Sequence, residues 1–233
     1  MKNPTSQSSG ASQARLAGWL YLLVIPLGIF GGLYVPSQVT VSGDAAATAA
    51  NLTTSASLYR LGIASELLAS IDMLFVVLLL YGLLKVVSKP AAASMVMLVL
   101  VGASIAFISA VFELEALKVL GSTSGFPADQ ARSQMSLMLS LSGLAGMLAF
   151  IFWGLWLIPL GYLVFKSGFF PRVLGVLLVL AGVGYAFDSF ATVLGSELSI
   201  GLYTALGEII FVLWLVIRGV DAVRWEERAR AAA

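Results

Sequence analysis

Six long runs of apolar residues, separated by short polar segments, dominate the chain. They lie at about 15–36, 61–87, 92–120, 136–165, 172–195 and 200–218. An α-helix needs about 20 mostly apolar residues to cross the hydrocarbon layer of a membrane. The pattern therefore predicts an all-α, polytopic membrane protein with six transmembrane helices in a bundle.

The polar segments between the runs predict the connections. Residues 1–13 are small and polar and are expected to form a disordered leader, and residues 220–233 form a charged tail. In the first loop, Ser42-Gly43-Asp44 is typical of the start of a short helix. The segment 121–135 is rich in turn formers and polar residues, and its function does not follow from its composition.

The first apolar run has a second interpretation, as a cleaved signal peptide. Arg15 precedes the run, and the small residues Ala45-Ala46-Ala47 follow it as a cleavage site would. The run is longer than a usual signal-peptide core and contains Pro26 and several glycines. We expect it to be retained as the first membrane span.

Composition agrees with a membrane protein and narrows the chemistry. Of 233 residues, 60% are hydrophobic and 11% charged, whereas soluble domains carry about 25% charged residues. The chain has neither cysteine nor histidine, which excludes disulfides, thiolate nucleophiles, Cys/His zinc sites and histidine-ligated haem. We expect no cofactor and no metal. The net charge of +1 leaves no basic face for nucleic acid.

The distribution of basic residues predicts how the chain is threaded. Ten of the thirteen Lys and Arg residues fall in the leader with Arg15, in the turns at Lys85/Lys89 and Lys166/Arg172, and in the tail with Arg218 before it. The opposite loops hold the other three, namely Arg60, Lys118 and Arg132. Because positive loops stay in the cytoplasm, we expect a multi-pass protein of the inner (plasma) membrane with both termini cytoplasmic.

Acidic residues inside the apolar runs are the strongest candidates for function. A charged side chain at the centre of a membrane helix costs a few kcal/mol, so it must face the bundle interior, water or a cation. Glu113 and Glu115 are two residues apart and point in different directions, whereas Glu115 and Lys118 are placed to pair. Asp188 has Tyr185, Ser189 and Thr192 as local partners. The ligand-binding hypothesis names Arg60, Glu66, Asp72, Glu113, Asp188 and Glu208.

Three functions remain open for these acids. With the expected threading, they lie between the membrane centre and its outer surface and form an acidic, outward-facing pocket for a small solute or cation. Alternatively, two carboxylates act as acid and base in an intramembrane enzyme for lipids, although no nucleophile or other catalytic residue stands out. In the third interpretation, the acids pair with Arg60, Lys118 or backbone donors in a structural or assembly subunit. Membrane lipids are expected partners, and the oligomeric state is undetermined.

Small residues also recur at helix-packing intervals, as in Ser142/Gly146 and Gly182/Ala186. Such pairs allow helix backbones to approach closely.

The stretch Phe152–Gly175, FWGLWLIPLGYLVFKSGFFPRVLG, resembles the bacterial integral membrane family known as domain of unknown function 4386. The resemblance extends through AGVGYAFDSF (181–190) and GEIIFVLWLVIRG (207–219), with RLAGWLY (15–21) and YRLG (59–62) near the N-terminus. It implies a polytopic bacterial inner-membrane protein without an assigned activity. Arg60, Asp188 and Glu208 fall inside the matching motifs. We expect the motif at Phe152–Gly175 to identify the family rather than the site.

Overall fold

The computed structural model describes residues 4–121, 125–196, 198 and 200–232, and the regular elements in this part of the chain are all helical. Residues 1–3 of the predicted leader and 122–124 of the polar loop lie outside it. The described chain forms two compact units. Unit 1 comprises residues 1–22, 72–102 and 149–233, and unit 2 comprises 23–71 and 103–148. Each unit is described by itself.

Five helical segments are long and apolar enough to cross a membrane, which confirms a multi-pass membrane protein. The first, Gly10–Val39, combines most of α1 (Pro4–Ile29) with η1 (Phe30–Tyr34) and α2 (Val35–Val39). The fourth, Ala128–Ser167, combines α6 (Ala128–Leu155) and α7 (Leu157–Ser167). The other three are single helices: α4 (Ala56–Leu84), α5 (Lys89–Val119) and α8 (Arg172–Val193).

The sixth predicted span, 200–218, is divided. Its residues form the short helix α9 (Gly201–Thr204) and the apolar helix α10 (Leu206–Ile217). The two together cover about 25 Å at 1.5 Å per residue, which is less than the hydrocarbon layer of about 30 Å. The structure therefore confirms five helices of spanning length, and the sixth crossing stays a prediction.

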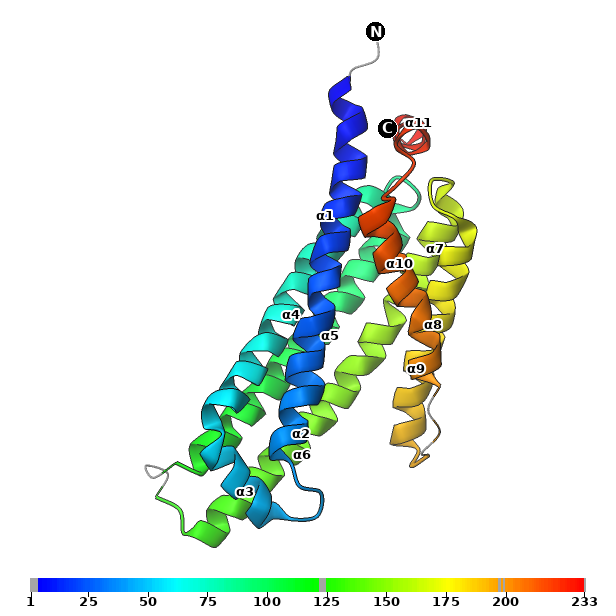
Figure 1. Cartoon of the computed structure of the whole chain (residues 1–233). Coiled ribbons are helices and arrows are strands. Elements are labelled where there is room, and N and C mark those ends of the chain that lie inside the picture. The colour runs from blue at the N-terminus through cyan, green and yellow to red at the C-terminus, as the bar shows by residue number, and fades with distance from the viewer. Residues whose placement is uncertain (1–3, 122–124, 197, 199, 233) are drawn as a thin grey trace. The chain divides into compact units, whose positions relative to one another are not determined.

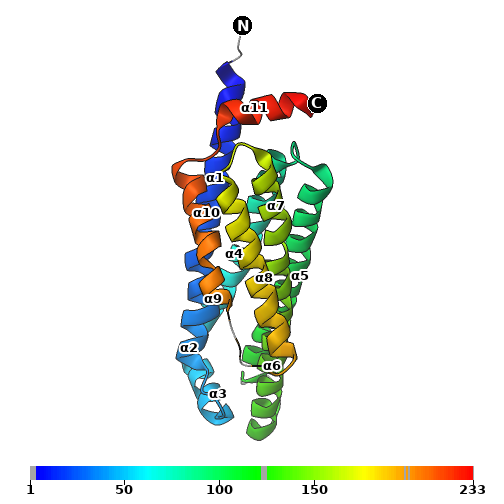
Figure 2. The same cartoon turned by 90° about the vertical axis from the view of Figure 1, so that its right-hand side faces the viewer.

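Within unit 1, α7 and α8 form a helical hairpin that is held closely by glycines (Figures 1 and 2). A Cβ atom added to Gly161 would lie 2.6 Å from the carbonyl oxygen of Gly175, and one added to Gly182 would lie 2.7 Å from that of Gly154. The turn contains Gly168 at φ 78°, a conformation that suits glycine. Backbones in contact thus explain the glycines of the motif at Phe152–Gly175.

The small-residue pairs expected from the sequence behave differently from one another. Gly182 packs against the facing helix, as predicted. At Gly146, in contrast, an added Cβ would meet no described atom within 4 Å. The prediction of close helix packing there is wrong, because the spacing of small residues does not say which faces meet another helix.

A break between α6 and α7 interrupts the fourth span at Trp156. Pro159 has no amide hydrogen, so it cannot donate to the carbonyl of Leu155 as a regular helix would require. The helix resumes with Leu160 donating to the carbonyl of Trp156 at 3.3 Å. Trp156 itself is only 1% exposed, so the break is packed inside unit 1.

The described residues near both termini are helical and contact other helices of unit 1. The helix α1 begins at Pro4, so residues 4–13 are helical where the sequence predicted a disordered leader. Tertiary contacts account for the difference: Gln13 donates from Nε2 to the carbonyl of Leu79 at 2.9 Å, and Gly10 fits against the indole of Trp225. That tryptophan belongs to α11 (Ala222–Ala231), and its Nε1 donates to the carbonyl of Leu83 at 3.0 Å.

Unit 2 has its own apolar core and one irregular turn. Asp44 starts α3 (Ala45–Thr54) by accepting a hydrogen bond from the amide of Ala47 at 2.8 Å, as the sequence indicated. The element η1 is a π-helical turn, a widened form that is rare and often occurs at functional sites. The core is formed by Val35, Val39, Ala49, Leu52, Tyr59, Ile63, Ala110, Ala116, Leu117, Val119 and Met135.

The glycine contact between α7 and α8 gives a stability prediction. Gly161→Ala places a methyl group against a rigid backbone carbonyl, so we expect it to destabilise the protein by about 1–3 kcal/mol. Gly143→Ala is the matched control, because no described atom lies within 4 Å of its added Cβ, and there helix propensity favours alanine. Thermal unfolding in detergent measures both. Equal melting temperatures for the two variants would contradict the packing described.

Candidate functional site

The six residues of the ligand-binding hypothesis divide equally between the two units. Unit 1 contains Asp72, Asp188 and Glu208, and unit 2 contains Arg60, Glu66 and Glu113. Each set has its own hydrogen-bond partners, so the two sets are described separately.

In unit 1, the carboxylate of Glu208 is bound by two tyrosine hydroxyls. Glu208 lies in the first turn of α10. Tyr21 of α1 donates to its Oε1, and Tyr185 of α8 donates to its Oε2 at 2.9 Å. Three helices therefore meet at one carboxylate, and both of its oxygens are satisfied by neutral donors.

Aromatic rings hold the two tyrosines in place. The ring of Trp156, at the break between α6 and α7, lies 5.8 Å from that of Tyr21. Phe150 packs edge-on against Tyr185 at 5.9 Å. Tyr21 is only 3% exposed, so its hydroxyl is fixed by its surroundings. Packing of this kind preorganises the donors around the Glu208 carboxylate.

Asp72 lies at the level of this cluster along the helices. Gln13 of α1 contacts Leu79 of α4, and the two helices run side by side in opposite directions (Figure 1). Tyr21 is eight residues after Gln13 and Asp72 is seven before Leu79, so the two share a level within about one residue rise of 1.5 Å. Asp72 is 9% exposed, and its Oδ2 has no hydrogen-bond partner within the described chain.

Asp188 has one of the local partners that the sequence suggested, because the hydroxyl of Thr192 donates to its backbone carbonyl at 2.9 Å. Its two carboxylate oxygens accept the backbone amides of Ile200 and Gly201, at 2.7 and 2.8 Å, so it anchors the start of α9. Tyr185 donates to Glu208 instead, and the hydroxyls of Ser189 and Thr192 donate to backbone carbonyls. Asp188 thereby has a positioning role, since it orders the segment that leads to α10 and Glu208.

In unit 2, Glu113 lies at one end of a series of hydrogen-bonded hydroxyl groups. Ser142 donates to Glu113 Oε1 at 2.9 Å, and its hydroxyl is also 2.8 Å from that of Ser109. The neighbouring Glu115 turns outward and pairs with Lys118 at 3.1 Å. The predictions that Glu113 and Glu115 point apart, and that Glu115 pairs with Lys118, are both confirmed.

Glu66 packs against the π-helical turn of unit 2. A Cβ added to Gly31 would lie 2.5 Å from Glu66 Cγ, so only glycine permits this approach. Glu66, Glu113 and the buried Tyr59 lie near enough to one another to interact electrostatically. This second cluster therefore combines two acids, a tyrosine and two serines beside an irregular turn.

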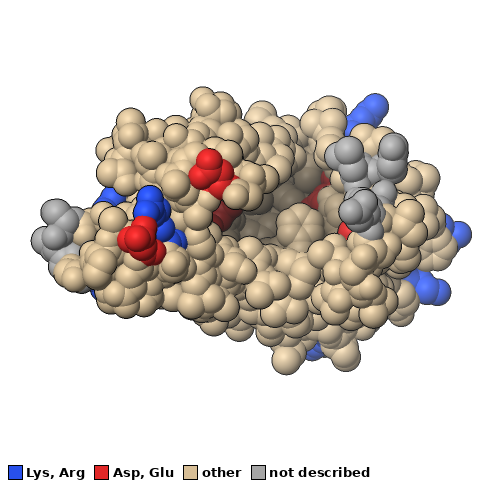
Figure 3. Space-filling view, turned by 90° about the horizontal axis from the view of Figure 1, so that it is seen from below, with Lys and Arg blue, Asp and Glu red and all other residues tan. Residues whose placement is uncertain are grey.

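Salt bridges do not neutralise these acids. The ion pairs of the described chain join residues three or four positions apart: Lys118–Glu115, Arg132–Asp129, Arg224–Asp221 and Arg230–Glu226. Arg60 is exposed and belongs to none of them. Figure 3, which views the molecule from below, shows a surface with few Lys, Arg, Asp or Glu side chains.

No group of three or more Asp or Glu side chains in the described residues is placed to hold a metal ion. The Glu208 cluster offers one carboxylate and two phenol oxygens, a set suited to a proton or a small monovalent cation. The Glu113 cluster instead places a serine hydroxyl next to a carboxylate, an arrangement typical of proton transfer.

Sequence reasoning missed the hydroxyl partners, Tyr21, Ser109 and Ser142. Tyr21 ends the motif Arg15–Tyr21, and a tyrosine inside an apolar run is the signal that was available. Nothing in the sequence indicates that it meets a residue 187 positions away.

Comparison with known proteins identifies relatives without an assigned activity. The family described as "Domain of unknown function (DUF4386)" matches residues 16–219. A protein of Archaeoglobus fulgidus described as "Uncharacterized protein" is 46% identical over 72 residues, which are 31% of this chain and 44% of that protein. The matched stretch thus spans less than half of that relative. No solved structure matches the chain.

Proposed function

The chain belongs to the DUF4386 family of membrane proteins, and from its site we propose that it binds or moves a small monovalent cation, a proton included, through intramembrane carboxylates. The observation that carries the proposal is Glu208, a carboxylate inside an apolar bundle whose partners are two tyrosine hydroxyls rather than a cation. A tyrosine hydroxyl can both donate and accept a hydrogen bond. The cluster can therefore take up a positive charge by turning a hydroxyl.

Asp72 supports the same function. Its buried Oδ2 has no partner in the described chain and is available to a proton or cation. A buried acceptor without a hydrogen-bond partner destabilises the folded protein by about 1–3 kcal/mol, and by more if the group is charged. Such an atom is therefore typical of a position that binds a ligand or a proton. Asp72 and Tyr21 lie at the same height along their helices in unit 1, and Tyr21 binds Glu208. The carboxylate of Asp72 therefore lies at about the same height as that of Glu208.

Interrupted helices around Glu208 also agree with this function. The fourth span breaks at Trp156, which packs on Tyr21, and the last apolar segment is divided into the short helices α9 and α10, with Asp188 bound to the amides that begin α9. In secondary transporters, broken helices and their exposed backbone groups surround ion and substrate sites at the membrane midplane.

We further propose that α9 and α10 form a sixth crossing, which places both termini in the cytoplasm at the inner membrane and opens the acidic pocket outward. Basic residues support this threading, since the turns at Lys85/Lys89 and Lys166/Arg172 and the tail are rich in them. The polar helix α11, which follows Gly219 at φ 67°, runs across the long helices in Figure 2. This orientation suits a helix at a membrane surface.

If Glu208 binds the cation, removing its charge should reduce the response of the protein to that cation. In proteoliposomes that contain the full chain, we expect flux of H⁺, Na⁺ or K⁺ above that of empty vesicles, or a rise in melting temperature with Na⁺ or K⁺. Glu208→Gln keeps the side-chain shape but removes the charge, and should reduce the response at least tenfold. Tyr21→Phe and Tyr185→Phe should each weaken it, because each removes one donor from a carboxylate.

The matched control is Glu115→Gln, which removes an exposed carboxylate paired with Lys118. It should leave flux and melting temperature responses unchanged. A wild-type protein that responds to none of the three cations, or an equal loss in both glutamine variants, contradicts the proposal.

Intramembrane catalysis on a lipid is the second candidate, and Ser142 favours it. Its hydroxyl donates to Glu113 at 2.9 Å, so Glu113 can act as a general base for a serine nucleophile. This function predicts covalent labelling of the purified protein by a fluorophosphonate probe, lost in Ser142→Ala and reduced in Glu113→Gln. Absent labelling, or equal labelling of the wild type and Ser142→Ala, contradicts the enzyme.

The threading has its own test. Fluorescent protein fused after Ala233 should be fluorescent, because it stays in the cytoplasm. Alkaline phosphatase should be inactive at that position and active when inserted after Thr54, in the first loop. The reverse pattern at Ala233 would leave an odd number of crossings and overturn the sixth span.

A further inference from the structure

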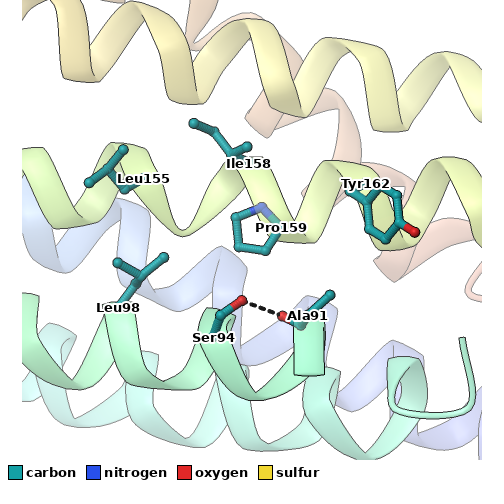
Figure 4. A pocket seen from close by; sticks show the side chains of 7 residues that line it. All are labelled: Ala91, Ser94, Leu98, Leu155, Ile158, Pro159 and Tyr162. Atoms are coloured by element: carbon teal, nitrogen blue, oxygen red, sulfur yellow. Dashed lines mark hydrogen bonds between the residues drawn. The ribbon is translucent and has the colours of Figure 1, made fainter. Parts of the chain in front are cut away.

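An apolar groove runs between α5 and the broken fourth span on the surface of unit 1. It encloses about 500 Å³, within the range of small-molecule sites. One wall comes from α5, with residues at positions i, i+3 and i+7, and the other from α6 and α7, at i, i+3, i+4 and i+7. Figure 4 shows the two walls facing each other, formed by Ala91, Ser94, Leu98, Leu155, Ile158, Pro159 and Tyr162.

The lining of the groove suits hydrocarbon rather than a polar ligand. Its one aliphatic hydroxyl, that of Ser94, donates to the carbonyl of Ala91 at 2.9 Å and is therefore occupied. The ring of Pro159, three residues after the helix break at Trp156, is part of the lining. The surrounding surface is apolar as well, with Met97 and Leu100 of α5 67% and 53% exposed. A groove in such a surface is filled by whatever hydrocarbon the membrane supplies.

Positive charge at one end of the groove favours lipids with an anionic headgroup. Ala91 and Tyr162 lie at the same end in Figure 4. Lys166 follows Tyr162 by one helical turn, so it extends along the same face of α7. Lys89 begins α5 two residues before Ala91 and points about 200° away from it around the helix, so it adds positive charge at this end of unit 1 without lining the groove. Both lysines are exposed, and neither is in a salt bridge in the part of the chain that the structure describes.

Nearby acids do not compensate for this charge. In the C-terminal helix of the same unit, Asp221 is paired with Arg224 and Glu226 with Arg230. An anionic phosphate at the end of the groove would therefore meet the ammonium group of Lys166, which has no salt-bridge partner in the described chain. Clustered Lys and Arg at a membrane interface attract acidic headgroups by about 1 kcal/mol each.

We propose that this groove binds one acyl chain of an anionic phospholipid, whose phosphate is held by Lys166. The site is separate from the Glu208 cluster and does not depend on cation binding there. A lipid bound here would cover the break between α6 and α7 and would thereby stabilise the interrupted form of the fourth span.

The absence of cysteine from the chain allows a site-specific test. Ser94→Cys introduces a single thiol in the groove, which is labelled with a bimane fluorophore in the full chain. The protein is reconstituted in vesicles of phosphatidylcholine with a minor fraction of brominated phosphatidylglycerol or, separately, brominated phosphatidylcholine. We expect quenching by the anionic lipid to be about fivefold more effective, as one lysine–phosphate contact implies.

Two controls locate the effect. Leu180→Cys places the label on an exposed position of α8 away from the groove and should show no preference between the two lipids. Adding Lys166→Gln should remove the preference at Ser94→Cys, whereas Lys118→Gln, which removes an exposed lysine of unit 2, should preserve it. Equal quenching by the two lipids at Ser94→Cys, an equal preference at Leu180→Cys, or a preference that survives Lys166→Gln overturns the proposal.

Discussion

A carboxylate inside a membrane must obtain its hydrogen bonds from the protein, because lipid offers none. Glu208 shows how this constraint shapes unit 1. Its two oxygens need two donors, and these come from α1 and α8, so three helices are brought to one point. The tyrosines must in turn be held by rings from the fourth span, Trp156 and Phe150. For the same reason, the carboxylate of Asp188 accepts hydrogen bonds from the backbone amides that begin α9.

The sequence predicts well what depends on local composition. Apolar runs identify five helices of spanning length, because the hydrocarbon thickness sets the minimum length that a spanning helix needs. The outward turn of Glu115 and its pairing with Lys118 follow from helix geometry, which is local.

Properties that depend on which helices meet were beyond sequence reasoning. Tyr21 and Glu208 are 187 positions apart, and Ser142 and Glu113 are 29 apart on different helices. A small-residue spacing predicted packing at Gly146, where the structure has open space, and missed Gly161, which touches the backbone of Gly175. The helical order of residues 4–13 likewise rests on tertiary contacts of Gln13 and Gly10, which composition does not encode.

The family motif at Phe152–Gly175 is closer to the candidate site than its sequence suggested. Its glycines join α7 to α8, which fixes the helix that carries Tyr185. Its Trp156 packs on Tyr21, the other donor to Glu208. Both hydroxyls around the carboxylate are therefore positioned from this one stretch, although none of its residues binds Glu208 directly. A substitution in the motif that shifts the hairpin should change the site as well as stability, because the two share the same contacts.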